Sequence, residues 1–334
     1  MTQVSFGFPA AGFLGPSHMT MGTFDGVHRG HQALLKPLIA GARQVGATSV
    51  VVTFEPHPRC VLDPENCPAN LTTLEEKTWL LDQLGLDHLV VIPFTPQIAA
   101  LSPAVFMQRL LRGIQVRRMV IGENHRFGHG QRGDPAFLRR LGTRHDFTVE
   151  VAPTLARGKA PISSSRIRRL VLLGQVRAAA QLLGRDYVMR STVEHGLKRG
   201  RELGFPTANL RIGANKLLPG TGIYAVRVDI EGRAYAGALS VGFRPTFGSN
   251  SLTVEVFILD FDGDVYDKLL TVWFVQRLRA EKRFASVAAL QQQMSRDVAA
   301  ARRILGIDPA GHTLHARLST PGLADPPSPA SGGG

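Results

Sequence analysis

The sequence predicts an α/β domain with a parallel, doubly wound sheet, followed by a small antiparallel β-barrel domain with a C-terminal helix. Three observations carry this prediction. The chain has 334 residues, a length that suits two domains. In its first half, short apolar strands alternate with helical stretches, as in a parallel sheet. In its second half, strands follow one another with only turns between them, as in an antiparallel sheet or barrel.

The first half contains five predicted strands, at 19–21, 49–54, 88–92, 118–121 and 148–151. The helices between them have recognisable start signals. Thr73 and Glu76 have the spacing of a capping box, and Gly85 suits the end of that helix. Ser102 and Asp134 each precede a proline at a first helical position.

The second half begins with a helical stretch over 165–183 that is broken at Gly174. Strands are then predicted at 187–194, 207–212, 222–230, 233–241, 252–259 and 270–278. A helix over 287–305 follows, with Ser286 as its cap and Gly306 as its stop. We therefore expect domains at 1–185 and 186–312, and a disordered tail at 313–334 that ends in Pro, Ser and Gly.

Composition limits the classes of partner. The chain carries 39 Lys and Arg against 26 Asp and Glu, a net charge of +13, which suits anionic partners. The basic residues are scattered, which favours nucleotide substrates over nucleic acid, while a merely solvated basic surface stays open. No apolar run reaches the length of a membrane span, and no export signal is visible. We expect a cytoplasmic protein in which Cys60 and Cys67 are reduced thiols rather than a disulfide. A homo-oligomer is compatible with the sequence.

The most informative segment is GTFDGVHRGH, residues 22–31, which lies between a predicted strand and a predicted helix. Gly22 and Gly30 let the backbone approach an anion, and the helix N-terminus favours negative charge. His28 and His31 add donors that can hold a triphosphate. A single histidine on a turn is usually only solvated, but the ordered combination indicates a nucleotide site.

Three further segments carry candidate chemistry. ISSSRIR, residues 162–168, places hydroxyls and a guanidinium at a helix start, where serines are often plain caps. Thr207 and Asn209 lie two apart on a strand, so they share a face and can ligate Mg²⁺ with phosphates. Ordinary strand residues remain the alternative. Glu255 lies in an apolar strand, either facing solvent or accepting a proton from a substrate alcohol.

Seven motifs in order resemble those of the prokaryotic bifunctional riboflavin kinase/FMN adenylyltransferase family, over residues 15–306. They are GTFDGVHRGH, TFEPHPR, GENHRFG, ISSSRIR, GRELGFPTANL, SVGFRPTFG and VEVFILDF. The resemblance implies a Rossmann-like nucleotidyltransferase domain and then a riboflavin kinase barrel. It implies that ATP phosphorylates riboflavin to FMN, and that a second ATP adenylylates FMN to FAD and releases pyrophosphate. Mg²⁺ with ATP would be the cofactor, and flavins the substrate and product.

The resemblance also implies roles for particular residues. In the first domain, His28 and His31 would bind ATP phosphates and act catalytically. Other residues there would contribute to nucleotide binding: Gly22, Phe24, Gly30, Asn124, Ser164, Ser165 and Arg168. In the second domain, nucleotide binding would fall to Gly200, Gly204, Thr207 and Asn209, with Thr207 and Asn209 holding the metal. Glu255 would be the catalytic base.

Three positions depart from the family pattern: His125 where an aromatic such as Phe is usual, Phe257 where His is frequent, and Asp267 where Gly is usual. Two alternative functions stay open. One is another nucleotidyltransferase with the His-x-Gly-His motif, although the barrel would then lack a purpose. The other is a basic RNA-binding or regulatory protein on this scaffold, although no aromatic-interleaved basic stretch is present.

Overall fold

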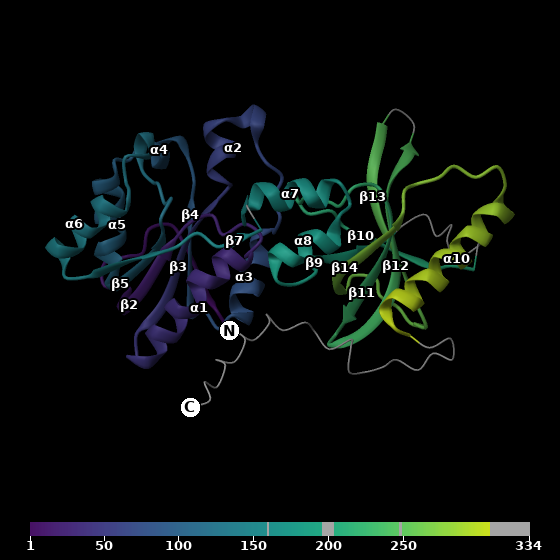
Figure 1. The fold of residues 1–334 in the computed structure, drawn as a ribbon, viewed down its shortest axis with the longest axis horizontal. Helices are drawn as coiled ribbons and strands as arrows, with labels where there is room; N and C mark the ends of the chain where they lie inside the picture. Colours follow the sequence, from purple (N-terminus) through teal and green to yellow (C-terminus); the bar gives the residue numbers. More distant parts are fainter. Residues whose placement is uncertain (159, 196–203, 247–248, 308–334) are drawn as a thin grey trace. The chain divides into compact units, whose positions relative to one another are not determined.

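The structure of the chain is a computed structural model that describes residues 1–158, 160–195, 204–246 and 249–307. The chain divides into two compact units, Met1–Arg166 and Ile167–Gly334, and each is described by itself. Gly200 and the predicted tail 313–334 lie outside the described residues. Figure 1 colours the chain from purple at the N-terminus to yellow at the end of the last helix.

The first unit is built on a parallel sheet whose described strands follow the order β1-β4-β3-β2-β5-β6. The bounds are β1 (Gln3–Phe6), β2 (Leu14–Met21), β3 (Thr48–Glu55), β4 (His88–Pro93), β5 (Ile114–Gly122) and β6 (Thr148–Ala152). From β2 the chain moves outward through β3 and β4 and then returns to β5 on the other side. This reversal makes the carboxyl ends of β2 and β5 the expected ligand site of a doubly wound sheet.

The helices of the first unit begin where their cap residues predict. Thr73 and Glu76 form the capping box of α3 (Leu74–Gln83), and Ser102 caps α5 (Pro103–Gly113). Asp134 caps α6 (Pro135–His145). The remaining elements are α1 (Arg29–Gln44), α2 (Pro58–Leu62), η1 (Pro64–Asn66), α4 (Pro96–Ala99), η2 (His129–Gln131), β7 (Ala156–Arg157) and β8 (Ala160–Pro161).

The sheet buries both faces, as a doubly wound fold requires. In Figure 1 its strands lie between α5 and α6 on one side and α1 on the other. Met19 and Met21 belong to a buried cluster with Phe106 and Leu110 of α5, whereas Leu35 of α1 is buried separately from it. Because side chains alternate along a strand, nearly continuous apolar runs supply both layers.

The expectation of two reduced thiols is wrong in this structure, because Cys60 and Cys67 form a disulfide. Cys60 lies in α2 and Cys67 follows η1, and the intervening turn brings their Cα atoms to 4.2 Å. The sequence spacing does not reveal this turn. The expectation rests only on the missing export signal, which carries no information about local geometry.

The second unit contains, among its described strands, a closed antiparallel barrel in the order β10-β13-β12-β11-β14-β9. The bounds are β9 (Tyr187–Glu194), β10 (Thr207–Leu210), β11 (Gly222–Ile230), β12 (Arg233–Thr246), β13 (Ser249–Ile258) and β14 (Leu269–Arg279). Closure explains how a sheet without crossover helices satisfies its edges. This architecture confirms the predicted small barrel.

Among the described residues, three helices accompany this barrel. α7 (Ser164–Leu172) and α8 (Val176–Leu183) are separated at Gly174, whose φ of +69° ends the helical run as predicted. α10 (Val287–Leu305) starts at its Ser286 cap, stops at Gly306, and contacts β11, β12 and β14. In Figure 1 α10 is the yellow-green helix beside the barrel.

Candidate active sites

The turn between β2 and α1 fixes the orientation of His28. This residue is the N-cap of α1, and its Nδ1 accepts a hydrogen bond from the backbone N–H of His31 at 3.3 Å. Since Nδ1 acts as the acceptor, the neutral imidazole carries its proton on Nε2. His28 is therefore held as a donor at a helix N-terminus, where an anion is favoured.

Both predicted histidines belong to one stack of rings. The His28 and His31 rings lie 3.6 Å apart at 16°, and the Phe24 ring meets His31 edge-on at 5.1 Å. The two predicted glycines make room for this stack. A Cβ on Gly22 would approach the Phe24 ring to 3.2 Å, and one on Gly30 would approach the His28 ring to 3.1 Å.

The buried residue Asp25, which is 2 % exposed, holds the turn in place. Its carboxylate accepts hydrogen bonds from the backbone N–H groups of Leu71 and Thr72, each at 3.0 Å. The Ser164 hydroxyl donates to the Asp25 carbonyl at 2.9 Å, so the structure brings Ser164 to the histidine turn. These bonds hold a backbone in which Phe24 has a positive φ of 46°, a conformation unfavourable for a bulky residue.

The other residues of the serine–arginine motif are less closely engaged. Ser165 lies exposed in the first turn of α7. Arg168 lies later on α7, beyond the division at Arg166, and belongs to the second unit.

Lys77 of α3 is a buried cation that the sequence analysis did not single out. It is 4 % exposed, and its Nζ donates to Thr53 Oγ1 at 3.4 Å. Thr53 in turn donates to the carbonyl of Thr23 in the histidine turn at 3.2 Å. Burial lowers the pKa of Lys77, while the charges of Asp25 and Glu55 oppose that shift. The available signal was a lysine at i+3 from Leu74 and i−4 from Leu81, on the apolar side of the helix.

Asn124 and His125 follow β5, the neighbour of β2 at the carboxyl edge. Asn124 is exposed, and its side-chain amide donates to Thr154 Oγ1 at 3.3 Å. The His125 ring lies 5.6 Å from the Phe127 ring. Burial, reinforced by the charge of Arg126, lowers the pKa of His125 to about 4. His125 is therefore an uncharged ring at neutral pH, like the aromatic residue expected there.

The second unit brings Thr207, Asn209 and Glu255 together. Asn209 of β10 is paired with Glu255 of β13, and the Thr207 hydroxyl donates to Glu255 Oε2 at 3.2 Å. Glu255 is half-buried between the buried residues Val254 and Val256. Paired residues and residues two apart share a face of a sheet, so one face presents all three polar side chains.

Two cavities meet at Thr207. The first has a volume of about 480 Å³ and lies between the barrel and α10, with Glu255 and Phe257 in its lining. The second has a volume of about 380 Å³ and is lined by Pro206, Tyr266 and neighbouring residues. Thr207 belongs to both linings, so a group bound at Thr207 can be reached from either cavity.

Two sequence departures have a structural account here. Phe257 lines the first cavity and meets the Phe205 ring edge-on at 5.4 Å, which makes that wall apolar. Asp267 has a positive φ of 60°, a conformation that Gly adopts readily and that Asp tolerates. Gly204, with a φ of 78°, is the first described residue after the segment 196–203 that contains Gly200.

The donor set suits Mg²⁺ bound jointly with phosphates. Among the described residues, no group of three or more His, Cys, Asp or Glu side chains can hold a metal ion. Mg²⁺ commonly takes one or two protein oxygens and completes its shell with phosphate and water. The Thr207 hydroxyl donates a hydrogen bond to Glu255, so the lone pairs of the hydroxyl oxygen remain for a cation. The side-chain amide of Asn209 lies on the same face.

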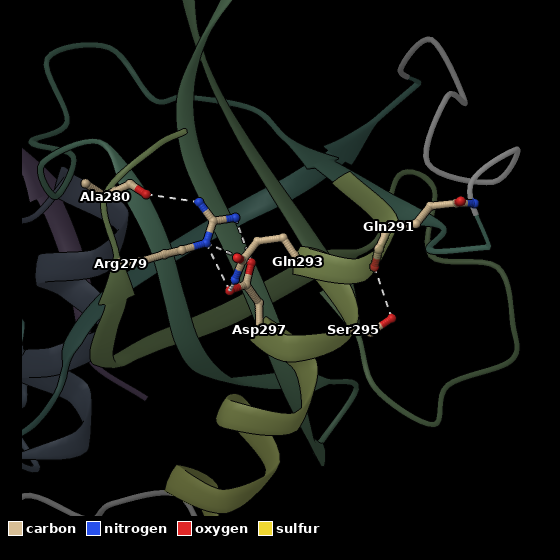
Figure 2. A network of polar contacts seen from close by, with 6 residues as sticks. All are labelled: Arg279, Ala280, Gln291, Gln293, Ser295 and Asp297. Carbon is tan, nitrogen blue, oxygen red and sulfur yellow. Dashed lines mark hydrogen bonds and ion pairs between the residues drawn. The ribbon is translucent and has the colours of Figure 1, made fainter. Parts of the chain in front are cut away.

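The sequence analysis also missed a polar cluster at the α10 side of the first cavity. Figure 2 shows Arg279, at the end of β14, against Asp297 of α10. Both side chains line the first cavity, and they are 15 % and 9 % exposed. The signal was an aspartate on the apolar stripe of the helix, four residues before the buried Ala301.

Family models match both units. The model described as FAD synthetase matches residues 13–166, and the model described as Riboflavin kinase matches residues 183–305. The histidine turn therefore lies in the first match, and the Thr207–Glu255 face lies in the second.

Relatives with both functions in one name match nearly the whole chain. A bifunctional riboflavin kinase/FMN adenylyltransferase of Pseudomonas fluorescens is 40 % identical over 88 % of this chain and 94 % of its own. The enzyme of the same name from Escherichia coli strain K12 is 34 % identical over 86 % of this chain and 93 % of its own.

A solved structure from Streptococcus pneumoniae, described as a macrolide-efflux protein, shares the fold. It is 31 % identical, with a TM-score of 0.76 over 86 % of this chain and 95 % of that one.

In the part of the chain that the structure describes, no helix combines the length and apolar character needed to span a membrane.

Proposed function

The chain belongs to the bifunctional riboflavin kinase/FMN adenylyltransferase family, and on this premise we propose that its two units divide the two reactions between them. The enzyme converts riboflavin to FMN and FMN to FAD. The second unit phosphorylates riboflavin, and the first transfers an adenylyl group to FMN. The observation that carries this division is the Thr207–Glu255 hydrogen bond at the junction of two cavities, in the unit matched by the riboflavin kinase model.

In the kinase reaction, Glu255 accepts the proton of the riboflavin 5′-hydroxyl as this oxygen attacks the γ-phosphorus of ATP. The flavin ring enters the cavity of about 480 Å³, whose lining includes the apolar side chains Phe205 and Phe257. The nucleotide enters the second cavity, beyond Thr207. Glu255 is held in place by the Thr207 hydroxyl, so its position does not depend on the substrate.

Thr207 and Asn209 would hold Mg²⁺ together with the phosphates of ATP. The ion would neutralise charge on the transferred phosphoryl group. Gly200 and Gly204 would bind the nucleotide beside them, because glycines allow close approach of the backbone to phosphates.

In the adenylyl transfer, the FMN phosphate attacks the α-phosphorus of ATP and pyrophosphate leaves. The attacking group is already an anion, so no protein nucleophile is required. His28, whose Nδ1 accepts the His31 N–H, can donate from Nε2 to developing negative charge, and the helix N-terminus that it caps favours an anion. Positioning and charge stabilisation therefore supply the rate enhancement.

The remaining residues are proposed for the same ATP site. Gly22, Phe24 and Gly30 shape the ring stack, and Ser164 is already bonded to the turn. Hydroxyl and guanidinium groups suit phosphate oxygens, so Ser165 and Arg168 are assigned to the triphosphate. Asn124 is assigned to the flavin or adenylyl end, since it follows the strand next to β2.

The alternatives gain no support. Another nucleotidyltransferase would leave the Thr207–Glu255 face and its cavities without a role. The relatives from Pseudomonas fluorescens and Escherichia coli are named for both flavin reactions, and neither name mentions RNA binding.

The test uses the purified full-length chain with riboflavin, ATP and Mg²⁺, with riboflavin, FMN and FAD separated by chromatography over time. We expect FMN to rise first and FAD to follow, and both to require Mg²⁺. A protein that makes FAD from added FMN but never FMN from riboflavin would overturn the kinase assignment.

A further inference from the structure

Arg279 is held in one orientation by an unusually complete set of acceptors. Its Nε donates to both Asp297 oxygens at 3.0 Å, and its Nη2 donates to Asp297 Oδ2 at 2.7 Å. Its Nη1 donates to the carbonyl of Ala280 at 3.0 Å. Figure 2 shows these contacts meeting at the guanidinium, from Asp297 of α10 and from Ala280, the residue after β14.

Asp297 is itself fixed. Gln293, one helical turn earlier, donates to Asp297 Oδ1 at 2.9 Å. Each carboxylate oxygen therefore accepts two hydrogen bonds, from Arg279 and Gln293 on Oδ1 and from Arg279 alone on Oδ2. The Phe284 ring lies 5.8 Å from the Arg279 guanidinium carbon and covers one of its faces. The pair has little freedom to reorient, so it is organised before any ligand arrives.

The contacts leave part of the guanidinium unused. Of the five N–H groups of an arginine, Asp297 and Ala280 occupy three. Within the stretches of chain that the structure describes, no acceptor meets the other two, one on each terminal nitrogen. Arg279 lines the same cavity as Glu255, so these two N–H groups are available to a molecule in that cavity.

We propose that Arg279 binds the carbonyl edge of the flavin ring through these two N–H groups, and that Asp297 is the positioning residue that aims them. This inference rests on the proposed kinase function. The pyrimidine part of a flavin carries two ring carbonyl oxygens, both acceptors, on either side of a ring N–H group, whereas its opposite edge is apolar. Glu255 meets the hydroxyl end of the substrate. Each oxygen of Asp297 already accepts two hydrogen bonds, so Asp297 does not take up the two remaining N–H groups of Arg279, and they stay available to the flavin.

The chain supplies a matched control. Arg302 of α10 pairs with Asp260, so it also ties this helix to the barrel side of the unit. Arg302 and Asp260 do not line the first cavity, the one of about 480 Å³. Arg302→Met therefore weakens the attachment of α10 and leaves the proposed flavin contact intact. Arg279→Met weakens the attachment of α10 and also removes that contact.

The experiment measures the Kd of riboflavin by its fluorescence change in the full chain without ATP. Arg279→Met should weaken binding about 10- to 100-fold, the range for losing a hydrogen bond from a charged donor. Arg302→Met should change it less than about 2-fold. The KM for riboflavin should rise with little change in kcat, because the ring contact is made equally in the ground and transition states. FAD formation from added FMN should be unchanged in both variants.

A second measurement separates contact from support. Riboflavin with one ring carbonyl replaced by a thiocarbonyl, a weaker acceptor, should bind the parent protein more weakly than riboflavin does. Arg279→Met should lose this discrimination, whereas a merely structural change would weaken both ligands alike. Asp297→Asn should weaken riboflavin binding, and adding it to Arg279→Met should have no further effect.

The proposal is overturned if Arg279→Met binds riboflavin within about 2-fold of the parent, or if discrimination against the thiocarbonyl flavin persists. Additive effects of the Arg279 and Asp297 changes would remove the positioning role of Asp297. A parent protein that makes no FMN would instead refute the proposed kinase function, so the two failures are distinguishable.

Discussion

At the scale of single residues, His28 has two roles: it caps α1, and it offers a hydrogen-bond donor to phosphate. Substitutions can separate the two roles. His28→Ala or His31→Ala should slow FAD formation from FMN about 10²-fold or more, as loss of an oxyanion donor does. Riboflavin phosphorylation in the same protein is the control and should barely change. His28→Asn keeps a cap acceptor and should restore stability without restoring FAD formation. Parental FAD rates in both alanine variants would make the histidines bystanders.

Glu255 is tested through the difference between the two nucleophiles. Riboflavin attacks with a hydroxyl that must lose its proton, whereas FMN attacks with an ionised phosphate. Glu255→Gln keeps size and a hydrogen-bonding group but cannot accept a proton. The kinase step should slow by roughly 10²- to 10⁴-fold, measured as FMN formation, while FMN adenylylation stays intact. A Gln variant with near-parental kinase rate would identify Glu255 as an ordinary strand residue.

His125 gives a pH dependence with a defined sign. Its pKa is about 4 when folded and 6.5 by default, so between these values the unfolded chain binds more protons. Stability of the first unit should therefore fall as pH drops below about 6.5. By pH 5 the His125 contribution amounts to about 2 kcal/mol. His125→Phe should remove this part of the pH dependence.

The measurement is urea unfolding at pH 7.5 and pH 5 in a Trp273→Phe background. Trp79 of α3 then reports on the first unit alone, since the chain has two tryptophans. Equal losses of stability on acidification with His125 and with Phe at this position would show that the imidazole is not desolvated.

At the scale of elements, a substitution at the start of α1 should raise the stability of the helix and lower the rate of FAD formation. Gly30→Ala should stabilise the helix by about 0.5–1 kcal/mol, because Ala is the better helix former. The new Cβ would lie 3.1 Å from the His28 ring and push it from the stack with His31. We expect slower FAD formation in a protein that melts no earlier, measured by activity and thermal unfolding together. An unimpaired FAD rate would show that the ring stack tolerates displacement.

At the scale of the whole molecule, each unit has its own core, so each should fold alone. The fragment 1–185 should make FAD from FMN and no FMN from riboflavin. The fragment 186–312 should make FMN from riboflavin and no FAD from FMN. Gly220 packs against the Leu172 carbonyl, and Gly174 lies against Tyr224 and Arg277. A fragment that starts at 167 should therefore be more stable to heat than one that starts at 186. Riboflavin phosphorylation by 1–185 would refute the assignment of reactions.

Local periodicity was enough to predict most elements. The strand at 222–230 and the helix at 287–305 have the predicted bounds, because period-two burial, a serine cap and a stop glycine are local signals. β1 was missed because its alternation of polar and apolar residues spans only four positions, too few to distinguish a strand from a loop, and the segment becomes a strand by pairing with β4. The strand order, and with it the ligand edge, is likewise a matter of pairing between distant segments.

For the candidate sites, the sequence by itself determined the chemistry that is available: histidines at a helix start, and hard oxygens and a carboxylate on strands. Only the tertiary structure decided which groups meet. Glu255 is bonded to Thr207, 48 residues away, and Asp297 is bonded to Arg279 across the junction of helix and strand. The apolar sides of their helices are the local sign that Lys77 and Asp297 are buried, but no local pattern names Thr53 or Arg279 as their partners. Cys60 and Cys67 look like separate thiols in the sequence. Proximity over long sequence separations depends on packing, which no local pattern encodes.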